Sequence, residues 1–284
     1  MLSRILVPVR GDGMGETVLS YAAKLAHRHG AHIVVAHCRA SPAEMLPYSV
    51  PLPAFARETI LEQAAELADQ EERELREKLH GMALALDLRE TDAPGGHAPT
   101  IAFVEEDGRM SDVVRHNGRL SDLIVVARPD RDRNLGTNSL KAGLFQTGRP
   151  VMMCPPGGVT GEDFGARITV AWNGSLEAAR TVGLTLALAE AAEEVTILSG
   201  GSGEPHGAST DELVAYYGLR GISAKVHRFE ARNPGAALLE KTVELGAQFL
   251  IMGAYGHSHE HETLFGGNTQ AVVDNAEIPV VMAH

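Results

Sequence analysis

The chain has 284 residues, enough for one large domain or two ordinary ones, because single hydrophobic cores stop growing near roughly 250 to 300 residues. Its composition, 44% hydrophobic and 22% charged, is that of a folded globular protein and excludes disorder as the main state. The formal net charge of −12, with no local basic patch, argues against nucleic-acid binding.

The first residues predict a strand, a helix and a second strand. Residues 4–12, RILVPVRGD, combine a basic residue, strand-forming residues and a polar turn that contains glycine. GETVLSYAAKLAHRHGA follows with apolar residues at helical spacing, and HIVVAHC at 32–38 is another apolar run. No charged leader precedes a long apolar segment, and no apolar run reaches about 18 residues. We therefore expect a cytoplasmic protein without a membrane span.

The rest of the first half continues the alternation of strands and helices. Four prolines prevent residues 39–56 from forming one helix, whereas Glu58 to His80 has a strongly helical pattern. Strand-like runs follow at 100–108 and 121–129, and RPVMMCPP closes this half. Cys38 and Cys154 end apolar runs and are expected to be buried and reduced, and His37 is expected to be a core or edge histidine.

The second half repeats this order. Its runs are RITVAWNGS at 167–175, the helical SLEAARTVGLTLALAEAA, EVTILSG at 194–200, AKVHRFEAR at 224–232, AQFLIMGAY at 247–255 and a closing IPVVMAH. Ser209 opens a helix through a capping box, and Asn233 with Pro234 opens another. Near-continuous apolar strands between amphipathic helices predict parallel sheets covered on both faces.

The predicted fold class is therefore α/β, with two tandem doubly wound domains that each hold a five-stranded parallel sheet. A linker rich in glycine and proline, residues 155–166, separates the halves. We place the first domain at 1–156 and the second at 165–284.

A glycine-rich loop follows the central strand of the second half, where open parallel sheets bind ligands. The loop contains Gly253, Gly256, Gly266 and Gly267, with nine residues between the second and third glycine, and Asn268 and Thr269 then begin a helix-like segment. Glycines let a backbone approach phosphate oxygens closely, and a helix N-terminus adds free N–H donors. Plain turns explain the spacing equally well when it is taken alone.

The spacing Gly, two residues, Gly, nine residues, Gly resembles the ATP-binding motif of the universal stress protein family. The order of strands and helices, the opening strand, the DLIVV-like central strand and the closing Pro-Val strand extend this resemblance over essentially the whole chain. The resemblance implies a tandem member with an adenine nucleotide alpha-hydrolase-like fold in each domain. It also implies ATP, with or without Mg²⁺, as the ligand of the second domain, and a regulatory role in stress response.

The resemblance assigns an ATP site residue by residue. The site consists of Ala171, Trp172, Asn173, Gly200, Gly253, Gly256, Gly266, Gly267, Asn268 and Thr269. Asn173 replaces the family's usual Asp, yet its amide can still hydrogen-bond adenine or ribose. Gly267 replaces the usual Ser or Thr, which removes a hydroxyl and keeps the amide. Ser175 either contacts phosphate or caps the next helix.

The first half departs further from the family's motif. Ala127 and Asp130 stand where the first two glycines would be, and Arg10 stands at the adenine-binding Asp position. Because Asp130 would place a carboxylate against phosphates, we expect this half to bind no ATP. It would instead pack against the second half as an intramolecular pseudo-dimer, and further association into a homodimer is left open.

Two alternatives to ATP binding stay open. His257, His259 and His261 alternate with acidic residues and could bind zinc or nickel, or, when protonated, lie beside phosphate. The other alternative is an interaction scaffold or small-ligand binder of the same fold, which the departures at Asn173 and Gly267 keep open. No loop residue is an obvious general base for attacking water, so we expect slow ATP hydrolysis at most and no dedicated enzyme.

Overall fold

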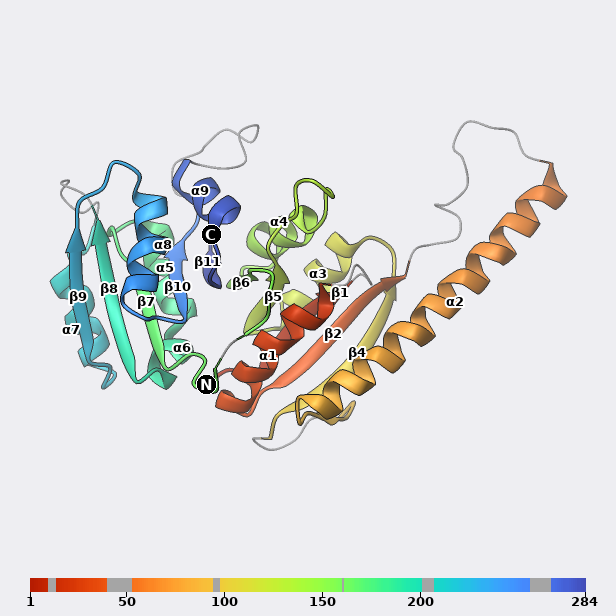
Figure 1. Cartoon of the computed structure of the whole chain (residues 1–284), viewed down its shortest axis with the longest axis horizontal. Helices are drawn as coiled ribbons and strands as arrows, with labels where there is room; N and C mark the ends of the chain where they lie inside the picture. Colours follow the sequence, from red (N-terminus) through yellow and green to blue (C-terminus); the bar gives the residue numbers. More distant parts are fainter. Residues whose placement is uncertain (10–13, 40–52, 94–97, 160, 201–206, 256–266) are drawn as a thin grey trace.

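The computed structural model describes residues 1–9, 14–39, 53–93, 98–159, 161–200, 207–255 and 267–284. The first half contains β1 (Arg4–Val9), α1 (Gly15–His29), β2 (His32–Arg39), α2 (Ala54–Ala85), β3 (Arg89–Glu90), β4 (Thr100–Asp107), α3 (Met110–Gly118), β5 (Leu123–Ala127), α4 (Thr137–Gln146) and β6 (Val151–Cys154). The second half contains β7 (Arg167–Ala171), α5 (Leu176–Leu184), α6 (Leu186–Ala191), β8 (Glu194–Gly200), α7 (Thr210–Gly218), β9 (Ala224–Phe229), α8 (Pro234–Glu244), β10 (Phe249–Gly253), α9 (Gly267–Asn275) and β11 (Val280–Ala283). The two halves lie side by side, with β6 and β11 between them (Figure 1).

The described strands form one sheet in the order β3-β4-β2-β1-β5-β6-β11-β10-β7-β8-β9. Strands within each half are parallel, and β6 and β11 join the halves as an antiparallel pair with Met152 opposite Val281. The predicted α/β class with tandem doubly wound parallel sheets is thus confirmed. The structure adds two features: the two-residue edge strand β3, and the fusion of both sheets into one. The domain limits 1–156 and 165–284 stay a prediction.

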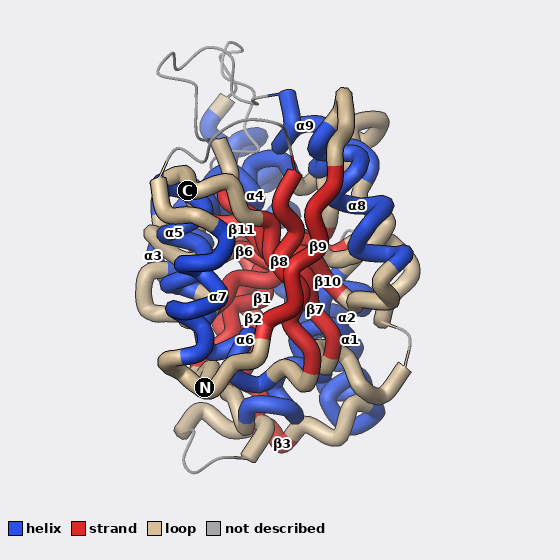
Figure 2. The backbone as a smooth tube through the Cα atoms, turned by 90° about the vertical axis from the view of Figure 1, so that its left-hand side faces the viewer, coloured by secondary structure: helices blue, strands red, loops and turns tan. Residues whose placement is uncertain are grey.

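Helices cover both faces of the sheet because successive strand residues point to opposite faces. The core on one face takes buried side chains from α1, α2, α5, α6 and α7, and the core on the other face takes them from α3, α4, α8 and α9. In the second half, α7 and α8 flank the strands on opposite sides (Figure 2). The central strand β5 is apolar throughout since it is covered twice; Leu123, Ile124 and Val125 are fully buried.

Two helices of the second half begin at the side-chain caps that the sequence predicts. Ser209 and Glu212 form a capping box at α7, and Asn233 Oδ1 accepts a hydrogen bond from Ala236 N, 3.3 Å away, at the start of α8. Both predicted caps are confirmed. The long apolar run after β7 forms two helices rather than the single one predicted, and the backbone of Thr185 between them leaves the helical region, with φ −109° and ψ 13°.

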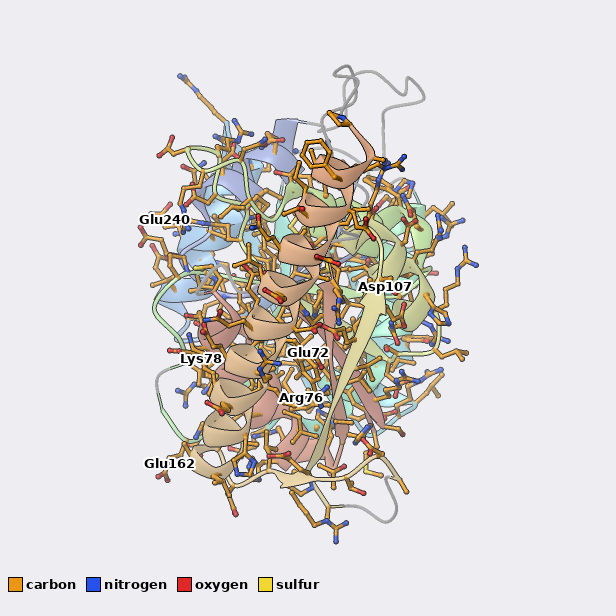
Figure 3. The ribbon with its side chains drawn as sticks, turned by 90° about the vertical axis from the view of Figure 1, so that its right-hand side faces the viewer. Glu72, Arg76, Lys78, Asp107, Glu162 and Glu240 are labelled. Carbon is orange, nitrogen blue, oxygen red and sulfur yellow. The ribbon has the colours of Figure 1, made fainter. Side chains whose placement is uncertain are left out.

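The longest helix, α2, exceeds its predicted limits of Glu58 to His80. Its buried side chains are Ala64, Ala68, Leu79 and Ala83, so charged residues dominate the rest of its surface. Lys78 lies on one flank and pairs with Glu16 at 2.7 Å, whereas Glu72 and Arg76 lie on the other (Figure 3). No described helix is long and apolar enough to cross a membrane.

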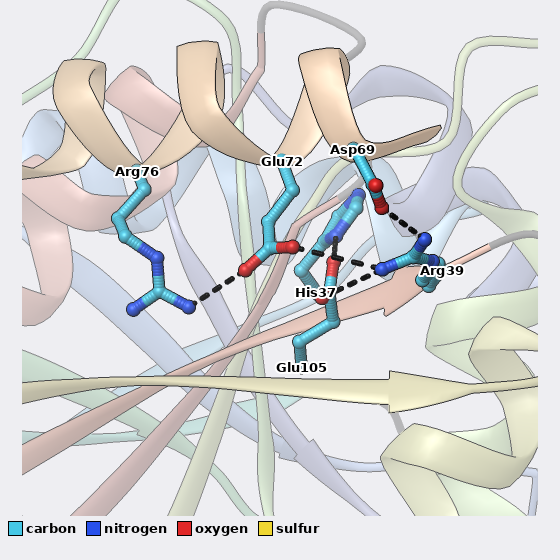
Figure 4. Close-up of polar contacts among 6 residues, drawn as sticks. All are labelled: His37, Arg39, Asp69, Glu72, Arg76 and Glu105. Carbon is cyan, nitrogen blue, oxygen red and sulfur yellow. Dashed lines mark hydrogen bonds and ion pairs between the residues drawn. The ribbon is translucent and has the colours of Figure 1, made fainter. Parts of the chain in front are cut away.

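The strands under α2 carry the charges that bind it. Arg39 on β2 forms ion pairs with Asp69 and Glu72 of α2, and with Glu105 of β4 (Figure 4). His37 Nδ1 lies 3.0 Å from Glu105 Oε1 and is buried, as expected for a core histidine. These ion pairs help to hold α2 on the sheet, because α2 buries few apolar side chains there.

The cysteine prediction holds for one residue of two. Both thiols are free, and Cys154 is fully buried, which raises its pKa. Cys38 is half-buried instead and lies next to Arg39, the last residue of β2.

The buried His29 at the end of α1 makes folding pH-dependent. Burial first, then the charges of the N-terminus and Arg28, lower its pKa to about 4 from 6.5, and Nδ1 accepts a hydrogen bond from Leu2 N at 3.4 Å. The unfolded chain therefore binds a proton below pH 6.5 that the folded chain binds only near pH 4. His29 supports stability fully above pH 6.5 and loses this contribution as the pH falls toward 4.

We expect His29→Gln, which keeps an acceptor for Leu2 N–H, to flatten this pH dependence. Between pH 6.5 and 4, the free energy of unfolding should fall less steeply in the variant than in the wild type. Urea titrations at four pH values across that window measure the difference. Parallel curves for the two proteins would contradict the assignment to His29.

Candidate functional site

The second half opens a cavity at the carboxyl ends of its strands. The strand order reverses at β7, which has β8 on one side and β10 on the other. Connections leave the sheet toward opposite faces at such a point, so a crevice forms there. The cavity has a volume of about 340 Å³ and receives residues from β7, β8, β9, β10, α5, α8 and α9.

The predicted site residues converge on this cavity. Those that line it are Ala171, Trp172, Asn173, Ser175, Gly200, Gly253, Gly267, Asn268 and Thr269. Gly256 and Gly266 lie outside the described residues. Segments almost 100 residues apart in the chain thus meet in one place, as parallel strand ends do.

An apolar floor, which the sequence reasoning missed, completes the cavity. Leu198, Phe229, Leu238 and Met252 line it together with Ala171. Leu198, Phe229 and Met252 stand within the last three positions of their strands. Their position near the strand ends is the feature of the sequence that could have identified them, because side chains there border the crevice of an open sheet. An apolar floor with polar groups at its rim is the usual composition of a small-molecule site.

Two glycines let the backbone segments around the cavity approach one another closely. A Cβ at Gly253 would lie 2.6 Å from Ala178 N, and one at Gly235 would lie 2.6 Å from the Asn268 carbonyl oxygen. Real Cβ atoms do not tolerate such distances, so β10 packs on α5, and α8 on α9, only because side chains are missing there. Gly253 therefore has a packing role beside the ligand contact predicted for it.

The turn after β7 uses its polar side chains to begin α5. Ser175 Oγ accepts a hydrogen bond from Ala178 N at 3.2 Å, and Asn173 Oδ1 accepts one from Ser175 N at 3.1 Å. Ser175 thus caps the helix while bordering the cavity. Because Oδ1 of Asn173 is engaged, the amide NH₂ is the group that this side chain can offer to a ligand as a donor. The neighbouring Trp172 is buried, and its Nε1 donates to the Ala208 carbonyl at 3.0 Å.

The N-terminus of α9 forms another wall. Gly267, Asn268 and Thr269 begin this helix at the cavity, where backbone N–H groups and the helix dipole favour anions. The Thr269 hydroxyl accepts a hydrogen bond from Tyr255 N at 3.3 Å. Tyr255 has φ +65°, a left-handed conformation that is costly for a residue with a side chain. Thr269 therefore supports a strained backbone where the chain leaves β10.

The corresponding loop of the first half contacts the second half instead. Arg128 Nη1 donates to the Ala276 carbonyl at 2.8 Å, and Arg131 pairs with Asp274 at 2.8 Å, next to the end of α9. Asp130 Oδ1 accepts from Arg133 N at 3.1 Å, and both residues border a separate cleft of about 530 Å³. Arg128 and Arg131 thus bind the second half, and Asp130 lines the separate cleft. The predicted lack of ATP binding in this half stays a prediction, and Arg10 lies outside the described residues.

The histidine tract lies outside the described residues as well, so the metal hypothesis for His257, His259 and His261 stays a prediction. Elsewhere in the described chain, no group of three His, Cys, Asp or Glu side chains is placed to hold a metal ion.

Comparisons with known proteins bear on both halves. The sequence model of the universal stress protein family matches residues 1–136 and 166–284. No curated protein matches the chain. A universal stress protein from Archaeoglobus fulgidus DSM 4304 has a similar structure, with 18% identity, a TM-score of 0.68, and coverage of 99% of this chain and 95% of that one.

Two further structures are similar to parts or all of the chain. A Pseudomonas aeruginosa UCBPP-PA14 protein described as belonging to the same family has 17% identity and a TM-score of 0.55, and the match covers 99% of this chain and 93% of that one. A universal stress protein in complex with cAMP matches 41% of this chain and 94% of its own, at 20% identity and a TM-score of 0.31. At these identities the full-length structural matches show a shared fold.

We expect Gly253→Ala to destabilise the second half, because its methyl group would meet the α5 backbone. Overpacking of this kind costs about 1 to 3 kcal/mol. Gly183→Ala is the matched control: it lies within α5, and nothing stands within 4 Å of the added Cβ. That variant should gain about 0.5 to 1 kcal/mol, since alanine favours helices. Urea midpoints of the two variants should therefore move in opposite directions, and a shift of both in the same direction would contradict the close approach.

Proposed function

Because this chain belongs to the universal stress protein family, we propose that its second domain binds an adenine nucleotide, ATP, in the cavity at the reversal of strand order. The observation that carries the proposal is the convergence of distant residues. Every residue that the resemblance assigned to the nucleotide, and that the structure describes, lines this one cavity.

The apolar floor suits the base. Phe229, Leu198 and Met252 offer an apolar surface that removes the faces of a purine ring from water and makes dispersion contacts with them. The Asn173 amide at the rim can donate a hydrogen bond to the base or the ribose. A cavity of about 340 Å³ lies within the range of small-molecule sites.

The phosphates would extend toward the N-terminus of α9. Gly267 and Asn268 are the first described residues of that helix, and N–H groups in the first turn of a helix can donate to phosphate oxygens. Gly256 and Gly266 complete the loop in the proposal by sequence alone. The sequence of the loop offers no obvious general base for attacking water, so we propose a regulatory nucleotide-binding protein of the stress response with slow hydrolysis at most.

A second candidate is a binder of a small uncharged ligand, and one observation favours it. Among the described residues that line the cavity, none is Lys, Arg or His, so no side-chain cation there faces a triphosphate. Adenosine and ATP, compared in one assay, separate this candidate from the first, because only the nucleotide carries the charge.

We expect calorimetric titration of the wild type with ATP in the presence of Mg²⁺ to show saturable binding. Ala171→Leu adds bulk to a residue that lines the cavity and should weaken ATP binding at least about tenfold, because a filled cavity cannot admit the base. Ala179→Leu on the exposed side of α5 is the control and should leave affinity unchanged. Equal affinities for the two variants would show that ATP binds elsewhere.

Gly267→Ser should strengthen ATP binding. No described atom lies within 4 Å of the position where a Cβ would stand at Gly267, and the family usually has a hydroxyl there. One added hydrogen bond to a charged group is worth about 1 kcal/mol or more, which corresponds to roughly fivefold in Kd. Adenosine, without phosphates, should bind the variant and the wild type alike. A gain for both ligands, or for neither, would argue against phosphates at the start of α9.

A further inference from the structure

Glu177 is an unexpected charge in the cavity. Of the described residues that line it, Glu177 alone is charged at neutral pH, and its charge is negative. The chain as a whole carries a formal charge of −12, so no general positive field offsets this carboxylate. A polyanionic ligand therefore meets repulsion from the protein at this point.

The position of Glu177 brings that charge next to the glycine loop. It lies in the first turn of α5, and a Cβ at Gly253 would be 3.0 Å from the Glu177 Cβ. Gly253 is the first glycine of the loop proposed to bind phosphates. Across the described part of the chain, no hydrogen bond or ion pair engages the Glu177 carboxylate, whose residue is half-buried.

Two negative groups side by side in a partly enclosed cavity repel each other more strongly than they would in water. A divalent cation between them reverses the sign of the interaction. Mg²⁺ commonly binds through one or two carboxylates together with phosphate oxygens and retained waters. The Glu177 carboxylate, which no described residue engages, matches that pattern as a single protein ligand.

We propose that Glu177 binds the divalent cation that accompanies the nucleotide, directly or through a coordinated water. The second domain thereby selects the metal complex of ATP over free ATP. This inference rests on the proposed function, because it needs phosphates at the glycine loop. It assigns to α5 a role in ligand charge selection that the glycine motif does not contain.

The test is a set of calorimetric titrations of the full-length proteins with ATP and with adenosine. Each titration is performed once with millimolar MgCl₂ and once with EDTA. The variants are Glu177→Gln and, as the matched control, Glu190→Gln, which removes the same charge from an exposed site on α6. Melting temperatures of all three proteins report whether the folds are intact.

In the wild type, ATP should bind at least about tenfold more tightly with Mg²⁺ than with EDTA, and adenosine should be indifferent to the metal. Glu177→Gln should shrink the Mg²⁺ effect to roughly threefold or less, because the cation loses a ligand and metal-free ATP binds better once the repulsion is gone. Glu190→Gln should behave as the wild type does.

Two results overturn the inference while leaving ATP binding in place. One is ATP binding in the wild type without a Mg²⁺ effect, and the other is an undiminished Mg²⁺ effect in Glu177→Gln. If neither ATP nor adenosine binds the wild type, the proposed function itself fails, and the role of Glu177 falls with it.

Discussion

The reversal of strand order at β7 is the constraint on which the second half depends. Helices α5 and α7 lie on one face and α8 and α9 on the other, so backbone segments diverge above the strand ends and leave a space that neither layer of helices fills. Because Gly253 and Gly235 have no side chains, α5 can pack closely against β10, and α8 can pack closely against α9. The reversal creates the cavity, and the two glycines permit close backbone contacts beside it.

The first half stabilises this arrangement from outside. Pairing of β6 with β11 continues the sheet, and Arg128 and Arg131 hold the far end of the helix whose first residues border the cavity. Phe145 of α4 packs 5.1 Å from the ring of Tyr255, the strained residue at the exit of β10. The first half, which departs from the glycine pattern, thus contacts α9 near its C-terminal end and contacts Tyr255, which bonds to Thr269 near the start of α9.

Most of the fold could be predicted from the repeated order of strands and helices and from the spacing of apolar residues. A buried parallel strand is apolar over its whole length, and few other segments are. The caps at Ser209 and Asn233 were predictable since capping is local. The break at Thr185 was not, because hydrophobic spacing does not reveal a local departure of the backbone from helical geometry. Leu198, Phe229 and Glu177 were also missed, because their meeting depends on which strand ends converge rather than on a spacing along the chain.

A crystal structure of the protein grown with ATP and Mg²⁺ tests the central claim most directly. The account predicts one nucleotide per chain, in the second half, with its base on the floor formed by Leu198, Phe229 and Met252 and its phosphates at the start of α9. Nucleotide bound only in the first half, or with base and phosphates exchanged between these two ends of the cavity, would contradict it.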